Sequence, residues 1–191
     1  QIPNTIKLHQ KNNKVTMSEE IFDIVDQCDR VIGQHSRGKI HQLGLRHRSV
    51  SLLVFNDLGQ LFLQKRSMKK DYAPGKWGAS VSGHVDTGED YDTAIVREAR
   101  EELGIILPEI PKKLFKLDAC RQTEQEFVWI YEYQYQGPFQ LHPEEVSDGR
   151  WFSIREVNQW IASRTEDLAK FFIFIWEMRE QKMRKVSTII S

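Results

Sequence analysis

The sequence has few cysteines, few prolines, no long apolar run and no net charge. Its 191 residues include 2 cysteines and 6 prolines, and 27 basic residues balance 27 acidic ones. The two cysteines, Cys28 and Cys120, are too few for a disulfide framework and lack metal-ligand spacing, so we expect reduced thiols in a cytoplasmic protein. The longest apolar run, Phe171 to Trp176, is far too short to cross a bilayer. The charge balance gives no field that would attract a nucleic-acid polymer or an anionic membrane.

The length suits a single domain with a sizeable core. No internal repeat or low-complexity linker divides the sequence, and no secretory signal is visible near its start. Residues 1–16 are polar and weakly patterned, and we expect them to form a flexible N-terminal extension. The folded domain is therefore expected over residues 17–191. The pattern is compatible with a monomer or a homodimer.

Hydrophobic patterning predicts a mixed β-sheet with helices. The segment 33–49 is rich in Gly, His, Arg and Lys and is predicted to be a loop. A helical pattern at 155–163 and a longer one at 165–185 follow the last strand, and the longer helix is expected to pack an aromatic stripe on the sheet. Strands are predicted at residues 20–26, 30–33, 49–55, 60–66, 114–120, 126–136 and 149–154.

A further helix is predicted between Asp90 and Gly104, and it carries three acidic residues on one side. Glu98, Glu101 and Glu102 stand at i, i+3 and i+4, within about a third of the helix circumference. Like charges at this spacing repel each other, and a hard divalent cation such as Mg²⁺ would compensate for that repulsion. On the glutamates alone, a solvated acidic face is the competing interpretation.

The same helix has an apolar stripe beside the glutamates, so one face can dock on a core while the carboxylates face a cleft. Asp90 or Asp92 is suited to cap its start, and Gly104 is suited to the left-handed conformation that often ends a helix. The stripe consists of Ile95, Val96, Ala99 and Leu103.

The spacing of the whole segment Gly83–Ile105 resembles the signature of the Nudix hydrolase family. We call this segment the box. The resemblance implies a Nudix fold, in which a mixed β-sheet lies in a three-layer α/β/α sandwich. It also implies attack by water on phosphorus in a small molecule that contains a diphosphate, often a nucleoside diphosphate derivative. The fixed positions filled here are Gly83, Glu89, Arg97, Glu98, Ala99, Glu101, Glu102, Gly104 and Ile105.

The resemblance also implies roles for the residues of the box. Glu98, Glu101 and Glu102 are expected to bind Mg²⁺ or Mn²⁺. Gly83 is expected to offer its backbone carbonyl or to allow close approach of the metal. Arg97 is expected to orient Glu101 through a salt bridge, so that Arg97, Glu101 and Glu102 form the catalytic set.

Two further roles are less closely determined. Glu89 is expected to tie the box loop to the helix, or to place another carboxylate behind the metal ligands. The box does not identify the general base. One of its glutamates could serve, or Glu144 or Glu145, although these two could equally lie in a solvated turn.

A narrower resemblance, over residues 20–155, is to the isopentenyl-diphosphate isomerase branch of the Nudix superfamily. It implies a second metal site of imidazoles and carboxylates, which would suit Zn²⁺ or Mn²⁺. His41 lies about one residue from where a further histidine is expected, and Arg66 and Lys70 are candidate diphosphate contacts. Ordinary polar loop side chains are the alternative. The matching positions are His47, His84, Glu124 and Glu126.

One residue departs from the isomerase pattern. The branch uses a cysteine immediately before the box glycine for proton transfer, and Ser82 stands there. A serine hydroxyl is far less acidic than a thiol, whose usual pKa is about 8.5. With an intact box, Ser82 favours a pyrophosphohydrolase over an isomerase, and a non-catalytic nucleotide-binding module is the third possibility. Substrate recognition outside the diphosphate is not readable from the box.

Overall fold

The computed structural model describes residues 19–163 and 166–190, with side chains as far as residue 185. The expected extension, residues 1–16, lies outside this part. The strands are β1 Ile21–Val25, β2 Val31–Ser36, β3 His47–Phe55, β4 Leu61–Arg66, β5 Trp77–Gly78, β6 Val81–His84, β7 Lys112–Leu117, β8 Glu126–Gln134 and β9 Val146–Phe152. The helices are α1 Arg37–Leu43, α2 Tyr91–Leu103, α3 Ile154–Ala162 and α4 Lys170–Ile190.

The main sheet has 7 strands in the order β5-β4-β3-β8-β7, with β6 paired to β3 and β9 paired to β4. The pair β3–β8 is parallel, whereas the other pairs in this sheet are antiparallel. The hairpin β1–β2 forms a separate 2-stranded sheet beside it. The predicted mixed sheet is therefore confirmed.

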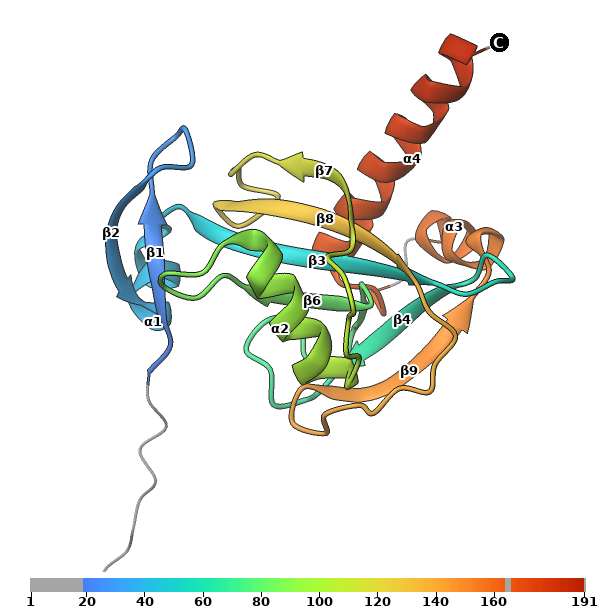
Figure 1. Cartoon of the computed structure of the whole chain (residues 1–191), viewed down its shortest axis with the longest axis horizontal. Coiled ribbons are helices and arrows are strands. Elements are labelled where there is room, and N and C mark those ends of the chain that lie inside the picture. The colour runs from blue at the N-terminus through green and yellow to red at the C-terminus, as the bar shows by residue number, and fades with distance from the viewer. Residues whose placement is uncertain (1–18, 164–165, 191) are drawn as a thin grey trace, which may run out of the picture.

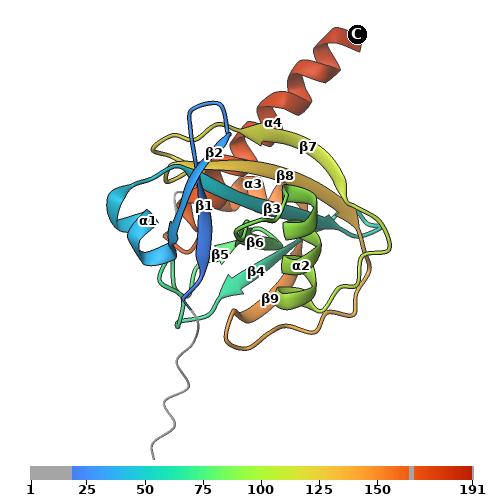
Figure 2. The same ribbon diagram turned by 60° about the vertical axis from the view of Figure 1, so that its left-hand side comes forward.

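Helices cover both faces of the sheet (Figures 1 and 2). The stripe of α2 packs on one face, where Ile95, Ala99 and Leu103 join a core with Val50 and Leu52 of β3. Helices α3 and α4 pack a second core on the opposite face, which includes Phe172, Ile175 and Trp176. The three-layer α/β/α sandwich is confirmed. Burying each of these large side chains contributes about 1.5–3 kcal/mol.

Strand β3 changes its neighbour on one side along its length. Its end, at Val54 and Phe55, pairs with β4, whereas Ser49–Leu52 pair with β6. The sheet is therefore open between β4 and β6. Because side chains alternate along a strand, Gly83 of β6 faces α2, whereas Ser82 and His84 point to the other side.

The prediction of a loop over residues 33–49 is wrong. It contains the end of β2, the helix α1 and the start of β3. Helix α1 is short and polar, and Ile40 is its one buried residue. Gly44, at φ +60°, ends it with its amide N–H donating to the His41 carbonyl. One buried side chain in seven residues gives no helical periodicity, which explains the missed helix.

Other boundaries moved by a few residues. Helix α4 begins at Lys170 rather than at 165, because residues 167–169 are held against β5. The backbone N–H of Trp77 donates to the carbonyl of Asp167, and the backbone N–H of Ala169 donates to the carbonyl of Trp77. Strand β9 begins at Val146 and stops before Ser153, which caps α3 in a capping box. Strand β7 covers 112–117, and the very short strands β5 and β6 were not predicted.

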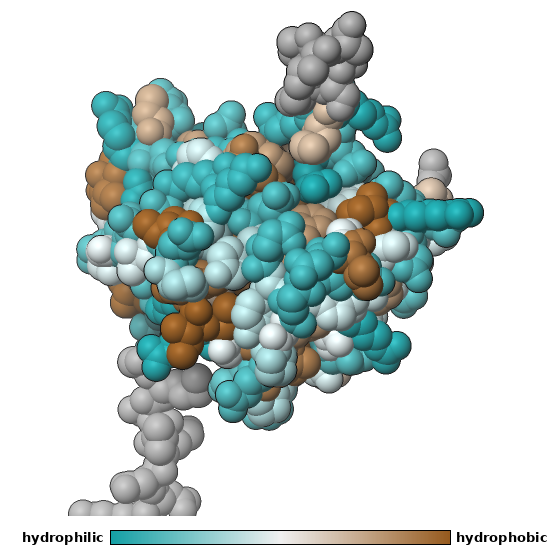
Figure 3. All heavy atoms as spheres, turned by 45° about the vertical axis from the view of Figure 1, so that its right-hand side comes forward, coloured by the Kyte–Doolittle hydropathy of each residue, from teal (hydrophilic) through white to brown (hydrophobic). Residues whose placement is uncertain are grey.

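None of the described helices is long and apolar enough to cross a membrane. The face in Figure 3 is mainly hydrophilic, and its hydrophobic residues form small separate groups. Among the described residues, the exposed large hydrophobic side chains Leu58, Met68 and Ile106 come from different loops, whereas Ile21, Val31 and Ile32 lie on the β1–β2 hairpin. Scattered exposed residues of this kind are normal on a protein surface and need no partner to explain them.

Candidate active site

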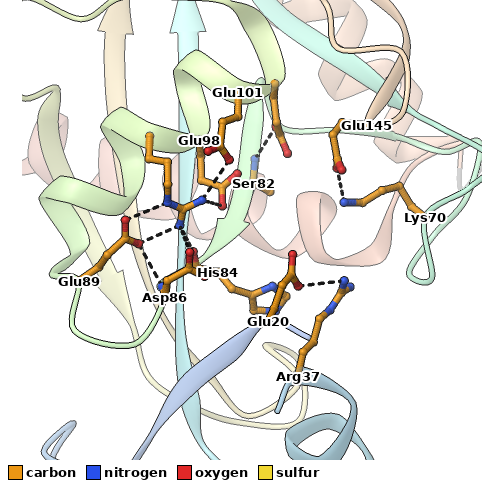
Figure 4. A network of polar contacts seen from close by, with 12 residues as sticks. Glu20, Arg37, Lys70, Ser82, His84, Asp86, Glu89, Glu98, Glu101 and Glu145 are labelled. Atoms are coloured by element: carbon orange, nitrogen blue, oxygen red, sulfur yellow. Dashed lines mark hydrogen bonds and ion pairs between the residues drawn. The ribbon is translucent and has the colours of Figure 1, made fainter. Parts of the chain in front are cut away.

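Arg97 holds the box together. Its guanidinium donates two hydrogen bonds of 2.8 Å to the carboxylate of Glu89 and one of 2.9 Å to the backbone carbonyl of His84. It also donates to Glu98 at 2.7 Å and to Glu101 at 3.2 Å (Figure 4). Glu89 in turn accepts a hydrogen bond from the backbone of its own loop. Both expected contacts, between Glu89 and the helix and between Arg97 and Glu101, are present.

Gly83 leaves room for the Glu98 carboxylate to lie against its backbone. A Cβ atom at residue 83 would stand 2.0 Å from Cδ of Glu98 and 2.2 Å from its Oε1. Any larger residue would displace this carboxylate. We expected close approach of a metal at Gly83, and the structure instead places the Glu98 side chain against it.

The box glutamates differ in exposure. Glu102 is buried and accepts hydrogen bonds from Nε2 of Gln64 at 2.8 Å and from the backbone N–H of Ser82 at 3.3 Å. The side chain of Glu98 is 13% exposed, and that of Glu101 is 56% exposed. Helix α2 thus presents two carboxylates inward and one near the surface.

Burial makes the inner carboxylates hard to ionise together. Burial raises the pKa of Glu98 to about 7, and burial followed by the charge of Glu98 raises the pKa of Glu102 to about 8. A cation bound between them would remove this penalty. The donors are all oxygens, which suits Mg²⁺ or Mn²⁺. The residues therefore fit the expected ion, although Arg97 holds Glu101 in this structure.

A single cavity of about 330 Å³ joins the box to the rest of the site. It lies at the opening between β4 and β6, and its lining includes Glu98, Glu101 and Glu102. Arg66 and Lys70, the expected diphosphate contacts, line the same cavity. Its wall on the α4 side includes Phe171 and Phe172, so part of the predicted aromatic stripe borders the cavity as well as the core.

Arg37 was not predicted but also lines the cavity. It opens α1, and its two ion pairs, with Glu20 at 3.4 Å and Asp71 at 3.5 Å, involve partners that are mostly exposed. Gln64, which orients Glu102, was also missed. Both were overlooked because a polar side chain in a predicted loop or strand carries no sequence signal of its own.

The structure brings three histidines together on the side of β6 opposite α2. Ring nitrogens of His41, His47 and His84 all lie within 4.8 Å of one another. Oε1 of Glu126 lies 3.3 Å from Nε2 of His47 and 3.3 Å from Nε2 of His84. Glu124 borders the cavity nearby. The four residues of the predicted second site therefore lie in one region, and α1 adds His41.

The electrostatics of this cluster favour neutral imidazole at His41. Partial burial, then the charges of His84 and His47, lower the pKa of His41 to about 4, although one side of the residue remains exposed. Burial opposes ionisation of Glu126, but its close contacts with the imidazoles of His47 and His84 outweigh it and hold its pKa well below the usual range. Burial and the nearby Glu126 raise the pKa of Glu124. A neutral imidazole beside an ionised carboxylate is a typical donor set for Zn²⁺ or Mn²⁺.

Ser82 lies between the two groups of candidate metal ligands. Its backbone N–H faces Glu102, and its Oγ is 2.8 Å from Oγ of Ser51. Neither cysteine lines the cavity: Cys28 lies exposed in the β1–β2 turn and Cys120 follows β7. No thiol of the described residues therefore replaces Ser82 in this site.

Comparison with known proteins agrees with this architecture. A family-wide sequence profile described as the NUDIX domain matches residues 45–172. A protein of Yersinia pestis named as an uncharacterised Nudix hydrolase is 34% identical over 175 residues, which cover 88% of this chain and 92% of the relative. An isopentenyl-diphosphate Delta-isomerase of Serratia proteamaculans is 31% identical over 160 residues, covering 82% of this chain and 89% of the relative.

A similar crystal structure is that of DR0079 from Deinococcus radiodurans. Its TM-score is 0.73 at 29% identity, with 85% of this chain and 98% of that chain covered. The α/β/α sandwich with acidic residues on a helix beside a cavity defines the class of fold and site. The chain belongs to the Nudix hydrolase family, enzymes that act on pyrophosphate bonds.

Proposed function

We propose that this protein is a pyrophosphohydrolase that uses Mg²⁺ or Mn²⁺ to cleave a phosphoanhydride bond in a small diphosphate-containing molecule. The observation that carries the proposal is the pair of inward carboxylates, Glu98 and Glu102, in one cavity with Arg66 and Lys70. Acidic ligands for a cation and basic contacts for phosphate oxygens are the two components that phosphoryl transfer to water requires.

Each residue has a defined part in this proposal. Glu98, Glu101 and Glu102 hold the cation with the backbone carbonyl of Gly83, and Arg97 orients Glu98 and Glu101. When bound, the cation neutralises charge on the phosphates and lowers the pKa of bound water. The cationic side chains of Arg66 and Lys70 bind the diphosphate from the other side of the cavity.

The test is a screen of nucleoside diphosphate derivatives, dinucleotides and isopentenyl diphosphate with Mg²⁺, Mn²⁺ or EDTA. We expect release of phosphate or a monophosphate that depends on the cation. Glu101→Gln and Glu102→Gln should each lower the rate by at least about 100-fold, because each removes a charged ligand. Full activity in either variant would refute its proposed role.

The cluster on the other side of β6 supports a second proposal about this site. We propose that His41, His47, His84 and Glu126 bind a transition metal, with Glu124 as a further candidate ligand. The compact arrangement of the imidazole nitrogens supports this site. Elemental analysis of protein incubated with Zn²⁺ or Mn²⁺ would test it, and His47→Ala should lower the bound metal by about one equivalent relative to the wild type.

The similarity to an isomerase favours one alternative function, isomerisation of isopentenyl diphosphate. Ser82 argues against it, because its hydroxyl is paired with Ser51 and is a much weaker acid than a thiol. Incorporation of deuterium from D₂O into isopentenyl diphosphate is the decisive measurement. Sustained exchange would favour the isomerase, whereas release of phosphate would favour the hydrolase.

We propose a cytoplasmic enzyme that works on a small molecule as a monomer or homodimer, not on a nucleic-acid polymer or at a membrane. The two free cysteines support a reducing compartment. A cavity of about 330 Å³ supports a small substrate, since it is near the lower end of common ligand-site volumes. Size-exclusion chromatography with light scattering would determine the oligomeric state.

A further inference from the structure

Two loops on the side of the cavity opposite the box are joined by two consecutive ion pairs. Lys69 pairs with Glu144 at 2.6 Å, and Lys70 forms a close ion pair with Glu145. The outer pair is on the surface, where the side chains of Lys69 and Glu144 are 66% and 58% exposed. The inner pair borders the cavity, and its side chains are 21% and 35% exposed. The two pairs therefore differ in what they face.

The backbone around Glu145 is fixed from two directions. Its N–H donates to the carbonyl of His142 at 3.0 Å, and its carbonyl accepts from the N–H of Ser67 at 2.9 Å. The N–H of His142 donates to the carbonyl of Glu102 at 3.0 Å. The loop that carries Glu145 is thus attached directly to the end of α2, where the metal-binding carboxylates lie.

A β-bulge aims this loop at the cavity. The register of β9 against β4 shifts by one residue, from Asp148 opposite Lys65 to Val146 opposite Arg66. The extra residue is Ser147, whose hydroxyl donates to the carbonyl of Lys65 at 3.2 Å. Bulges near active sites redirect neighbouring side chains. Here the strand leading out of the bulge keeps Val146 buried and leaves Glu145 at the cavity wall.

Lys70 also acts on the box from its position in the wall. Figure 4 shows Lys70 and Glu145 facing Glu98 and Glu101 across the site. The ammonium charge of Lys70 is among the influences on Glu98, after its burial and Arg97, and it acts to lower the pKa of that carboxyl. Lys70 therefore pairs with a carboxylate of the loop and also acts electrostatically on Glu98.

We propose that Lys70 and Glu145 exchange partners when a diphosphate enters the cavity, and that the released Glu145 carboxylate is the general base. This inference rests on the proposed hydrolase function and deepens it. Lys70 pairs with phosphate oxygens, which carry more negative charge than one carboxylate. Glu145, no longer paired, then faces the attacking water.

The proton and electron pairs balance in this step. The water oxygen forms a bond to phosphorus while one of its O–H bonds breaks, and the proton moves to a carboxylate oxygen of Glu145. The bond from phosphorus to the bridging oxygen breaks, and the leaving phosphate keeps its electron pair. Glu145 later returns the proton to solvent, after which its ion pair with Lys70 re-forms.

The structure also separates the two glutamates of this loop. Glu144 lies outside the cavity lining and is held by Lys69, so it cannot reach a water at the box without leaving the surface. Glu144→Gln is therefore a matched control for Glu145→Gln, with the same chemical change one residue away. Lys69→Met is the corresponding control for Lys70→Met.

The first experiment measures binding of methylene diphosphonate, a nonhydrolysable diphosphate, with Mg²⁺ by calorimetry. Glu145→Gln should bind it about threefold or more tightly, because Lys70 no longer has a competing partner. Lys70→Met should bind it about tenfold or more weakly, and both control variants should stay within about twofold. Unchanged or weaker binding by Glu145→Gln would overturn the exchange of partners.

The second experiment measures steady-state hydrolysis across pH for a substrate found in the screen above. Glu145→Gln should lower kcat by about 10²–10⁴-fold without raising KM, and should lose the acidic limb of the pH profile. A merely structural role would raise KM and leave the profile unchanged, and a kcat within about threefold of wild type would overturn the general base. No hydrolysis by the wild type would instead refute the proposed function, and the binding experiment would still decide the exchange.

Discussion

Gly83→Ala provides the sharpest structural perturbation of the box. A Cβ atom at this position would stand 2.0 Å from Cδ of Glu98, where ordinary contacts begin at 3.4 Å. The carboxylate must therefore move by about 1.4 Å, the difference between these distances. Arg97 must adjust with it, because its hydrogen bond to Glu98 is only 2.7 Å long.

This displacement should affect both activity and stability. A misplacement of about 1 Å can cost about 100-fold in rate, so we expect Gly83→Ala to lower kcat/KM by at least that factor. Overpacking of this kind costs about 1–3 kcal/mol in unfolding free energy. Urea unfolding and Mn²⁺ titration would measure the stability and the metal affinity. Gly33→Ala is the control, since the nearest atom to its added Cβ would be 3.9 Å away.

A double-mutant cycle decides whether the contact with Glu98 is the cause. In a Glu98→Ala background the carboxylate is gone, so Gly83→Ala should cost little further stability. The coupling between the two changes should therefore approach the full cost of Gly83→Ala alone. Additive costs, or a Gly83→Ala variant with wild-type metal affinity, would refute the reasoning.

Three other predictions concern the charges of the site. The raised pKa of Glu102 in the metal-free protein, about 8, favours the folded state below the ordinary pKa of 4.5, and this contribution disappears as the pH rises towards 8. In EDTA, the unfolding free energy of the wild type, measured in urea relative to that of Glu102→Gln, should therefore fall between pH 5 and pH 8. At pH 8, Mg²⁺ should raise the unfolding free energy of the wild type more than that of the variant. A difference between the two proteins that does not depend on pH would contradict this prediction. Arg97→Met should cost about 3 kcal/mol in unfolding free energy, because it leaves partly buried carboxylates unpaired, and a cost below about 1 kcal/mol would show that the network is not needed for folding. Co²⁺ added to the protein should give visible d–d absorption bands, and His84→Ala should weaken the Co²⁺ binding that these bands report by at least about tenfold, a result that requires no turnover.

The box could be predicted from the sequence because its chemistry lies within one short segment. Local spacing places Glu98, Glu101 and Glu102 on one helix, and the helix forms at the expected residues with Asp90 as its cap. The sequence did not reveal the reason for Gly83. The need for a glycine at this position depends on how closely α2 packs on β6, and that packing is a tertiary property.

The cluster of histidines was harder to predict in full. His47 and His84 lie on paired strands, so their proximity follows from sheet register once β3 and β6 are aligned. His41 reaches them from α1, a helix that the polar segment before β3 concealed. Phe22 of β1 stacks on His84 at 4.6 Å, so the N-terminal hairpin also supports the cluster. Contacts between distant segments of this kind have no local periodicity.

The wall of the cavity opposite the box shows the same limit of prediction from local sequence patterns. The sequence left the general base open between the box glutamates, Glu144 and Glu145. These two adjacent residues have similar sequence environments, but the bulge in β9 leaves only Glu145 at the cavity. A shift of one residue in register is decisive for side-chain direction, yet it is invisible in composition or hydrophobic pattern.

The most direct test of the proposed function is hydrolysis in ¹⁸O-labelled water, with products followed by ³¹P NMR. With Mg²⁺ or Mn²⁺, the wild-type protein should place one ¹⁸O atom on a phosphate product from a diphosphate substrate, and EDTA or Glu102→Gln should abolish this incorporation. The absence of any labelled phosphate across the whole substrate panel, or undiminished labelling by Glu102→Gln, would contradict the account.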